Sequence, residues 1–276
     1  MHTALVFAPH ADDAAAFCGG TLAKLADAGW RVVVVRVTDD ARDSVGLTCE
    51  ETVRRNTEEL KTAAAIMGIA DIMELGFPTD SLADVPETAL RERFVYALRK
   101  YQPYAVFTFD PFAPSEGNRD HVCVAQAVEE AFWVSCFDLH HPEHFQEGLA
   151  PFAVCERWYF GRPVSDQNHV EDITDFFEKR VAALAAHRTM MQNTLNQLLL
   201  QLRTFGRRAP MLEAAMADDL TPLVAAVLHE QTTAVAAAAG LPPDSKGEAY
   251  RVVRFGDMED MVEQLSEPLP DMPDAH

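Results

Sequence analysis

Short apolar segments alternate with amphipathic segments along the first 160 residues of the chain. The apolar segments are brief and rich in β-branched or aromatic residues, which predicts buried strands at residues 3–8, 31–38, 72–75, 105–109 and 154–160. The segments between them have helical periodicity and predict helices at residues 14–28, 49–67, 87–99 and 120–133. This alternation predicts a Rossmann-like, doubly wound, mostly parallel α/β sheet with helices on both faces.

The pattern becomes mostly helical after residue 173. A long helix is predicted over residues 174–202, and one late strand-like segment lies at residues 250–255. Because the chain contains no fixed-period repeat and no flexible linker, a separate second domain is not required. We therefore expect an α/β domain over residues 1–205 and a mostly helical extension over residues 206–276 that packs on it and ends in a frayed acidic tail.

Composition and charge narrow the functional classes. Hydrophobic residues make up 48% of the 276 residues and charged residues 24%, which is ordinary for a globular protein. The formal net charge of −20 argues against nucleic acid and membrane surfaces as partners, because both attract basic proteins. With no export signal and no apolar run of about 20 residues, we expect a cytoplasmic protein.

The cysteines indicate neither disulfides nor a thiolate metal site. They are odd in number, widely spaced and without a CxxC pair, and we expect them to be small buried apolar residues. They are Cys18, Cys49, Cys123, Cys136 and Cys155.

Two clusters of chemically active side chains follow predicted strands. Residues 9–13 (PHADD) follow the first strand, and residues 118–121 (NRDH) follow the strand at 105–109. In a doubly wound sheet, ligands bind beyond the carboxyl ends of the strands, near the point where the strand order reverses. Two histidines and one carboxylate would suit a hydrolytic zinc site there. The alternative is that His10 and His121 only cap helices or join surface networks.

A nucleotide-binding dehydrogenase is the natural rival for such a sheet. The turn after the first strand lacks G-x-G-x-x-G, and Gly19 and Gly20 fall inside the predicted helix instead of at its start. An acidic pair also stands where a pyrophosphate would bind. This disfavours a dinucleotide site.

The motifs resemble those of the PIG-L family, also called LmbE-like or GlcNAc deacetylases. The family's (A/P)HPDDE motif is similar to PHADDA at residues 9–14, and its HPDH motif is similar to NRDH at residues 118–121. Residues 54–68, 75–80 and 172–190 also resemble family segments. The resemblance covers roughly residues 3–190, so the domain over residues 1–205 is identified as LmbE-like and catalytic.

The resemblance implies a zinc-dependent hydrolase that removes an N-acetyl group from an N-acetylglucosamine-type sugar or glycoside. It implies that His10, Asp13 and His121 bind one Zn²⁺ per subunit, with another divalent transition metal as an alternative. Asp12 would be the general base that takes a proton from the metal-activated water and passes it to the leaving nitrogen. The expected partner is a small N-acetylated sugar or glycoside.

Three positions depart from the family pattern. Ala11 replaces a proline, Ala14 replaces a glutamate, and Asn118 replaces a histidine that would stabilise the oxyanion. An amide can donate a hydrogen bond but cannot act as an acid. As a catalytic residue, Asn118 would therefore stabilise the oxyanion by a hydrogen bond but would not donate a proton to it. Asp120 either orients a neighbouring side chain or caps the helix that follows. The alternative function is a catalytically impaired or silent metal-binding or small-molecule-binding protein of the same fold.

Further residues are candidates for contacts with substrate. Arg55, or its neighbour Arg54, would stand in for the family's substrate-contacting arginine, although the register from Gly68 places Asn56 there. The loop with His140, His141 and His144 would form a substrate wall, a proton donor or a second metal patch, or would be only a solvated polar loop. His187 is expected to pack or hydrogen-bond between helices, and the helices after residue 174 offer a surface for homo-oligomers.

Overall fold

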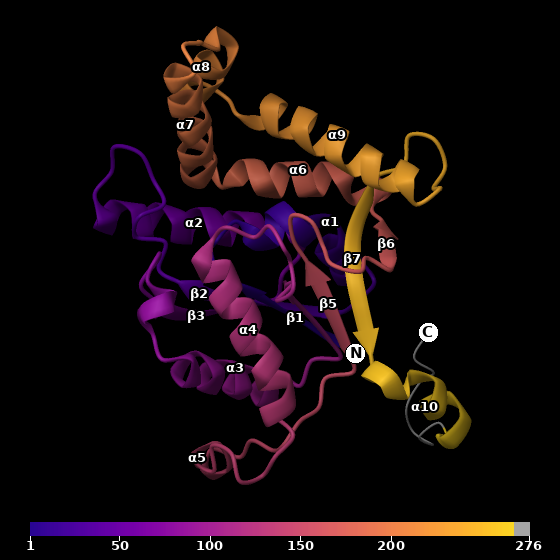
Figure 1. Ribbon diagram of the computed structural model, residues 1–276. Coiled ribbons are helices and arrows are strands. Elements are labelled where there is room, and N and C mark those ends of the chain that lie inside the picture. The colour runs from indigo at the N-terminus through magenta and orange to yellow at the C-terminus, as the bar shows by residue number, and fades with distance from the viewer. Residues whose placement is uncertain (268–276) are drawn as a thin grey trace.

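Seven strands form one sheet in the part of the chain that the computed structural model describes, residues 1–267 (Figure 1). The end of the acidic tail that was predicted to fray, residues 268–276, lies outside the described residues. In chain order the strands are β1 (Thr3–Ala8), β2 (Arg31–Thr38), β3 (Asp71–Phe77), β4 (Ala105–Phe109), β5 (Glu156–Phe160), β6 (His169–Asp172) and β7 (Gly247–Arg254). Their spatial order is β3-β2-β1-β4-β5-β7-β6.

The strands from β3 to β5 are parallel, whereas β7 is antiparallel to both β5 and β6. This confirms the predicted mostly parallel, Rossmann-like sheet. The five strands predicted before residue 161 are present, because runs such as VVVV in β2 bury both faces of a central strand. The sequence did not predict β6, which is four residues long, carries polar residues and pairs only with β7 at the sheet edge.

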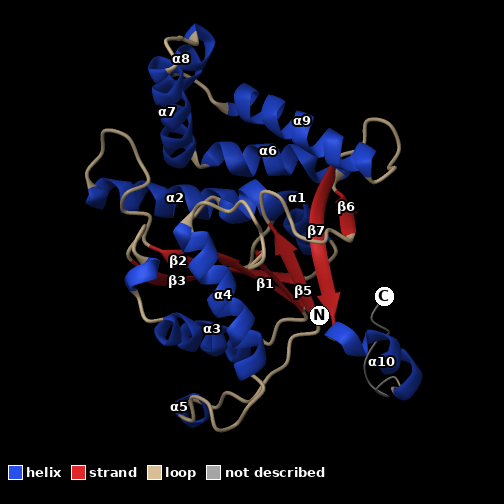
Figure 2. Cartoon of the chain, in the orientation of Figure 1, coloured by secondary structure: helices blue, strands red, loops and turns tan. Residues whose placement is uncertain are grey.

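Helices cover both faces of the sheet (Figure 2). The helices before residue 161 are α1 (Asp13–Asp27), α2 (Cys49–Met67), α3 (Glu87–Tyr101), α4 (Arg119–Val134) and the short α5 (Glu143–Gln146). α3 and α4 pack on one face, where Phe94 and Val128 share a core with Leu5 and Phe7 of β1. α1 packs on the other face against Val6.

The later helices form a further layer over α1 and α2 (Figure 1). They are α6 (Phe177–Ala186), α7 (Arg188–Thr204), α8 (Pro210–Ala217) and α9 (Thr221–Ala238). The last helix, α10 (Glu259–Leu265), follows β7 and lies away from this layer. α6 contacts α1 and α2, and α9 contacts α6. After α9 the chain returns to the sheet as β7, so the part beyond residue 205 contributes both helices and a strand. The division at residue 205 stays a prediction.

The single long helix predicted over residues 174–202 is wrong. A short 3₁₀ helix (Thr174–Phe176) precedes α6, and the chain turns at His187 before α7 begins. His187 is fully buried, neither of its ring nitrogens has a hydrogen-bond partner among the described residues, and burial lowers its pKa to about 4. Helix propensity is local, so an Ala/Leu-rich stretch does not reveal where packing turns the chain.

A buried ion pair ties β7 and α6 to α1. Glu248 accepts hydrogen bonds from the backbone N–H groups of Gly20 and Thr21, at 2.9 and 2.8 Å, and from the hydroxyls of Thr21 and Tyr250. Arg180 Nη1 lies 3.1 Å from Glu248 Oε1. Because buried charges are costly unless they are paired and hydrogen-bonded, this network requires α1, α6 and β7 to stay together.

The expectation that all five cysteines are buried is wrong. Cys18 is buried, Cys123 and Cys155 are partly buried, and Cys49 and Cys136 are exposed. All are free thiols. No helix within residues 1–267 has the length and apolar character needed to cross a membrane.

A substitution at Gly20 tests how closely α1 packs against the segment at Ile173. A Cβ at this position would lie 2.6 Å from Ile173 Cδ1 and 2.8 Å from its Cβ. We therefore expect Gly20→Ala to lower the free energy of unfolding by about 1–3 kcal/mol, measured by urea denaturation. Gly19→Ala is the control, because its nearest neighbours are the flexible side chains of Arg180 and Met67, at 3.3 and 3.4 Å. Equal losses in the two variants would contradict this account.

Candidate metal centre and active site

The candidate site lies where the strand order reverses. β1 and β4 are parallel neighbours, but the chain leaves β1 toward β2 on one side, and β4 lies on the other. His10 follows β1, Asp13 is the first residue of α1, and His121 lies in the first turn of α4. All three side chains are buried. The structure therefore brings together the three residues that the sequence predicted as metal ligands.

The distances within this triad fit a tetrahedral metal site. His10 Nδ1 lies 3.2 Å from His121 Nε2 and 3.3 Å from Asp13 Oδ2, and His121 Nε2 lies 3.4 Å from Asp13 Oδ1. Ligands about 2.0–2.1 Å from a zinc ion in tetrahedral geometry are separated by about 3.3 Å. The donor set of two imidazoles and one carboxylate, in mutual contact and buried, thus fits a divalent metal.

The second nitrogen of each imidazole also faces a carboxylate. His10 Nε2 lies 3.4 Å from Asp120 Oδ2, and His121 Nδ1 lies 3.3 Å from Glu116 Oε1. Asp120 is itself held by the backbone N–H groups of Asp80 and Leu82, at 2.7 and 3.2 Å. Such partners orient ligand imidazoles and select their tautomers. Asp120 is therefore a positioning residue in this structure.

Glu116 was not singled out from the sequence. It lies in the loop between β4 and α4, and the side chain is nearly fully buried. The available signal was chemical: a histidine ligand needs an acceptor for its second nitrogen, and Glu116 is an acid close to His121 in the chain.

Asn118, not Asp120, caps α4. Its Oδ1 accepts a hydrogen bond of 2.9 Å from the Asp120 backbone N–H, so the cap considered for Asp120 is wrong. Because Oδ1 is engaged, the side-chain amide is oriented and Nδ2 is left to donate. The catalytic role of Asn118 stays a prediction.

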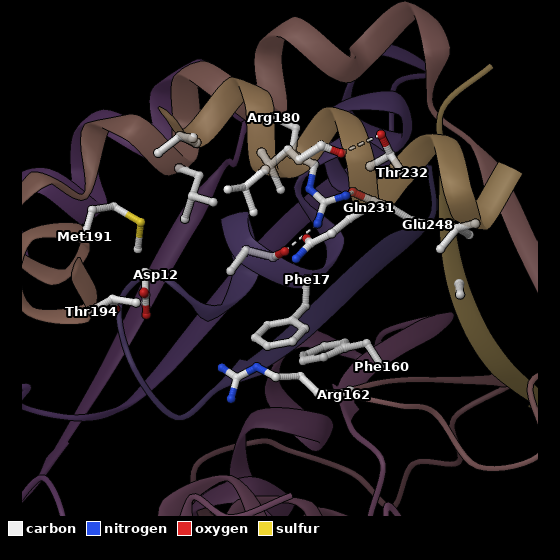
Figure 3. A pocket seen from close by; sticks show the side chains of 18 of the residues that line it. Asp12, Phe17, Phe160, Arg162, Arg180, Met191, Thr194, Gln231, Thr232 and Glu248 are labelled. Carbon is white, nitrogen blue, oxygen red and sulfur yellow. Dashed lines mark hydrogen bonds and ion pairs between the residues drawn. The ribbon is translucent and has the colours of Figure 1, made fainter. Parts of the chain in front are cut away.

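Asp12 lies beside the triad and outside it. Burial raises its pKa to about 7, and the neighbouring charge of Asp13 adds to this effect. Burial also tends to raise the pKa of Asp13. The charge of His121 and the hydrogen bonds from His10 and His121 outweigh burial and lower that pKa overall. A carboxyl group that titrates near neutrality is suited to accept and return a proton. Asp12 also lines a pocket of about 750 Å³ (Figure 3).

Arg55 does not reach the triad. Its Nε donates a 2.8 Å hydrogen bond to Glu51 on the exposed side of α2, and Arg54 pairs there with Glu51 and Glu58. Asn56 is the buried residue of this turn, and its Nδ2 donates to the backbone oxygen of Asp40. The helix turns Arg55 outward to pair with Glu51, and its contact with substrate stays a prediction.

The loop with His140, His141 and His144 lies at the opposite edge of the sheet. It follows the C-terminal end of α4, whereas His121 lies at the N-terminal end, and a helix of 16 residues is about 24 Å long (Figure 1). The proposed substrate wall or proton donor is therefore wrong, because the loop is too distant from the triad.

This loop instead packs around a buried arginine. Arg99 donates to the backbone oxygens of Phe137 and His140, at 2.7 and 2.9 Å, and lies 3.2 Å from His144 Nδ1. His144 Nε2 lies 3.0 Å from Glu92. His141, Glu143 and His144 are close enough to hold a metal ion, but both nitrogens of His144 already have protein partners. The cluster is explained by packing.

Replacement of one ligand tests the metal centre. We expect the purified wild-type protein to bind about one equivalent of zinc and His121→Gln to lose it, because two of three protein ligands hold the metal too weakly. Metal content is measured by elemental analysis, with thermal unfolding as a check on folding. The control, His141→Ala, should retain the metal. Full zinc content in His121→Gln would contradict this assignment.

Glu116 offers a milder test of the same centre. In Glu116→Gln the bond from the Asn118 backbone N–H to Oε1 is retained, and only the charge beside His121 is lost. We expect zinc affinity to fall about 10- to 100-fold, measured by competition with a chelating dye. Glu130→Gln, on the exposed side of α4, should leave the affinity unchanged. An unchanged affinity in Glu116→Gln would show that Glu116 does not support the ligand.

Comparisons with known proteins agree with this geometry. Residues 5–132 match the model of the PIG-L family, described as GlcNAc-PI de-N-acetylase. Diacetylchitobiose deacetylase from Thermococcus kodakarensis is 29% identical over 198 residues, which cover 70% of this chain and 72% of that protein. Residues 5–132 contain both clusters that build the candidate centre.

Solved structures show the same fold. N,N'-diacetylchitobiose deacetylase from Pyrococcus horikoshii superposes with a TM-score of 0.73 at 22% identity, covering 94% of this chain and 88% of that one. GalB, the 4-carboxy-2-hydroxymuconate hydratase from Pseudomonas putida, superposes with a TM-score of 0.66 at 17% identity, covering 92% and 96%. The fold alone therefore does not specify the reaction. The match over residues 5–132, together with the deacetylase relative, shows that this part of the chain is similar to the PIG-L family.

Proposed function

We propose that this protein is a zinc-dependent hydrolase that removes the N-acetyl group from an N-acetylglucosamine-type sugar or glycoside. The observation that carries the proposal is the contact of His10, Asp13 and His121 at the carboxyl edge of the sheet, with Asp12 beside them. Two imidazoles and one carboxylate leave a coordination position open, which is typical of hydrolytic metal centres. The family match and the deacetylase relative support the reaction class.

Each of these side chains has a separate role in the proposed reaction. A metal held by the triad supplies Lewis acidity toward the amide carbonyl and toward water. Asp12 takes the proton from the attacking water and delivers it to the leaving nitrogen, so that the amide bond breaks to an amine and acetate. Asp120 and Glu116 keep the two imidazoles in the orientation that binds metal.

Asn118 completes the proposed site. Its Oδ1 caps α4, and its Nδ2 donates a hydrogen bond to the oxyanion that develops on the carbonyl. All of these groups lie between residues 10 and 121, inside the proposed catalytic domain of residues 1–205. The extension from residue 206 supplies part of the wall of the adjoining pocket.

Asp12→Asn tests the role of the proposed base. We expect kcat for acetate release from N-acetylglucosamine glycosides to fall about 10²- to 10⁴-fold, because the amide cannot accept the proton. Zinc content and the unfolding midpoint should stay at wild-type values, since Asp12 is not a ligand in the triad.

Asp27→Asn, an exposed position at the end of α1, is the matched control and should keep full activity. Unchanged turnover in Asp12→Asn would remove Asp12 from the mechanism. Zinc binding without hydrolysis by the wild-type protein would instead indicate a silent metal-binding protein of the same fold.

A further inference from the structure

The loop between β4 and α4, residues 110–118, carries two groups of the candidate centre. Glu116 Oε1 lies 3.3 Å from His121 Nδ1, and Asn118 caps α4. The loop forms turns but neither helix nor strand. Ordering such a segment costs about 1–2 kcal/mol per residue in backbone entropy, so individual contacts must hold it in place. The contacts that fix this loop therefore also fix Glu116 beside the metal ligand.

Asp110 anchors the start of the loop. Its carboxylate is buried and accepts hydrogen bonds from the backbone N–H groups of Phe112 and Ser165, at 3.0 and 2.7 Å. Ser165 lies in the loop that follows β5, and its hydroxyl donates a 2.9 Å hydrogen bond to the backbone oxygen of Phe112. Asp110 thus joins the loops that leave two neighbouring parallel strands at the same edge of the sheet.

Arg251 supplies the positive charge that Asp110 needs in this buried position. Its Nη2 donates a 2.8 Å hydrogen bond to Asp110 Oδ1, and its guanidinium carbon lies 4.0 Å from the centre of the Tyr159 ring. Burial by itself would raise the pKa of Asp110, but the hydrogen bonds from Arg251 and from two backbone N–H groups lower it overall. Removing one partner of a buried ion pair is costly, because the other charge stays unpaired. The anchor at Asp110 therefore depends on Arg251.

Arg251 reaches this edge from the last strand of the sheet. β7 follows residues 5–132 in the chain, and it comes close to the loop because it pairs with β5, which pairs with β4 (Figure 1). A second ion pair, Arg254 to Glu156 at 2.9 Å, joins β7 to the other end of β5. The two pairs tie the same strands together, but only Arg251 lies at the edge that carries the candidate centre.

We propose that Arg251 is a positioning residue for the metal centre, since through Asp110 it fixes the loop that sets Glu116 against His121. This inference rests on the proposed hydrolase function and its metal. Arg251 acts through the loop and takes no part in proton transfer. The proposal gives β7 a role in a centre whose ligands all lie between residues 10 and 121.

Zinc affinity tests this role without a measurement of turnover. We expect Arg251→Met to weaken zinc binding about tenfold, measured by competition with a chelating dye, because Glu116 is no longer held beside His121. Arg251→Lys keeps a positive charge near Asp110 and should recover most of the affinity. Arg254→Met is the matched control: it removes the other ion pair between β7 and β5 and should leave the affinity unchanged. Wild-type affinity in Arg251→Met would overturn the proposal.

A double-variant cycle separates positioning from a general effect on stability. In the Glu116→Gln background, Arg251→Met should change zinc affinity by no more than about twofold, because the contact that Arg251 supports is already weakened. Two losses that multiply would show that Arg251 and Glu116 act independently, and the proposed role of Arg251 would be wrong. The midpoint of urea unfolding is measured for each variant alongside.

A second variant covers the case in which Arg251→Met does not fold. Asp110→Asn combined with Arg251→Met removes both charges, keeps an oxygen for the backbone N–H groups and still cuts the tie to β7. It should give the same loss of affinity and the same dependence on Glu116, and normal affinity in it would refute the proposal.

The outcomes for Arg251 and for the hydrolase function are distinguishable. Loss of zinc in His121→Gln but not in Arg251→Met would remove the positioning role and leave the proposed function standing. Zinc affinity that depends on Arg251, in a wild-type protein that releases no acetate, would support the positioning role and refute the hydrolase function.

Discussion

β1 and β4 lie side by side and parallel, with Ala4 opposite Ala105. In the chain, however, α1, β2, α2, β3 and α3 lie between them. A parallel pair brings the carboxyl ends of both strands to one edge of the sheet, and the connections leave in opposite directions at this point. His10 and His121 can meet only because of this pairing. The cluster of His10, Asp13 and His121, the carboxylates beside it and the position of Asp12 all depend on this pairing.

The polar residues at this edge are buried, and each of them has polar partners that offset the cost of its burial. Each imidazole nitrogen of the triad faces another imidazole or a carboxylate, and Asp120 is further held by two backbone N–H groups. Unpaired charges in such a place would cost several kcal/mol each, on the order expected for buried ions. A cluster that serves only to cap helices has no need for this convergence of donors on one point.

The later part of the chain completes the molecule in a different way. The Glu248 and Arg180 network locks β7 and α6 onto α1, and this positions α7 and α9 beside the mouth of the site at Asp12. The proposed catalytic groups therefore follow strands of the parallel sheet, while the shape and the apolar character of the adjoining pocket come from the helical layer.

The sequence by itself determined the strands before residue 161, because valine-rich runs bury strands whatever their partners. It also predicted His10, Asp13 and His121 as ligands, because the motifs after two strand ends resemble those of the PIG-L family. The tertiary structure alone decided how helices turn and which side chains converge. The break at His187, the outward direction of Arg55 and the remote position of His144 depend on packing, which local propensity does not encode. Glu116 acquires its role only when the fold sets it against His121.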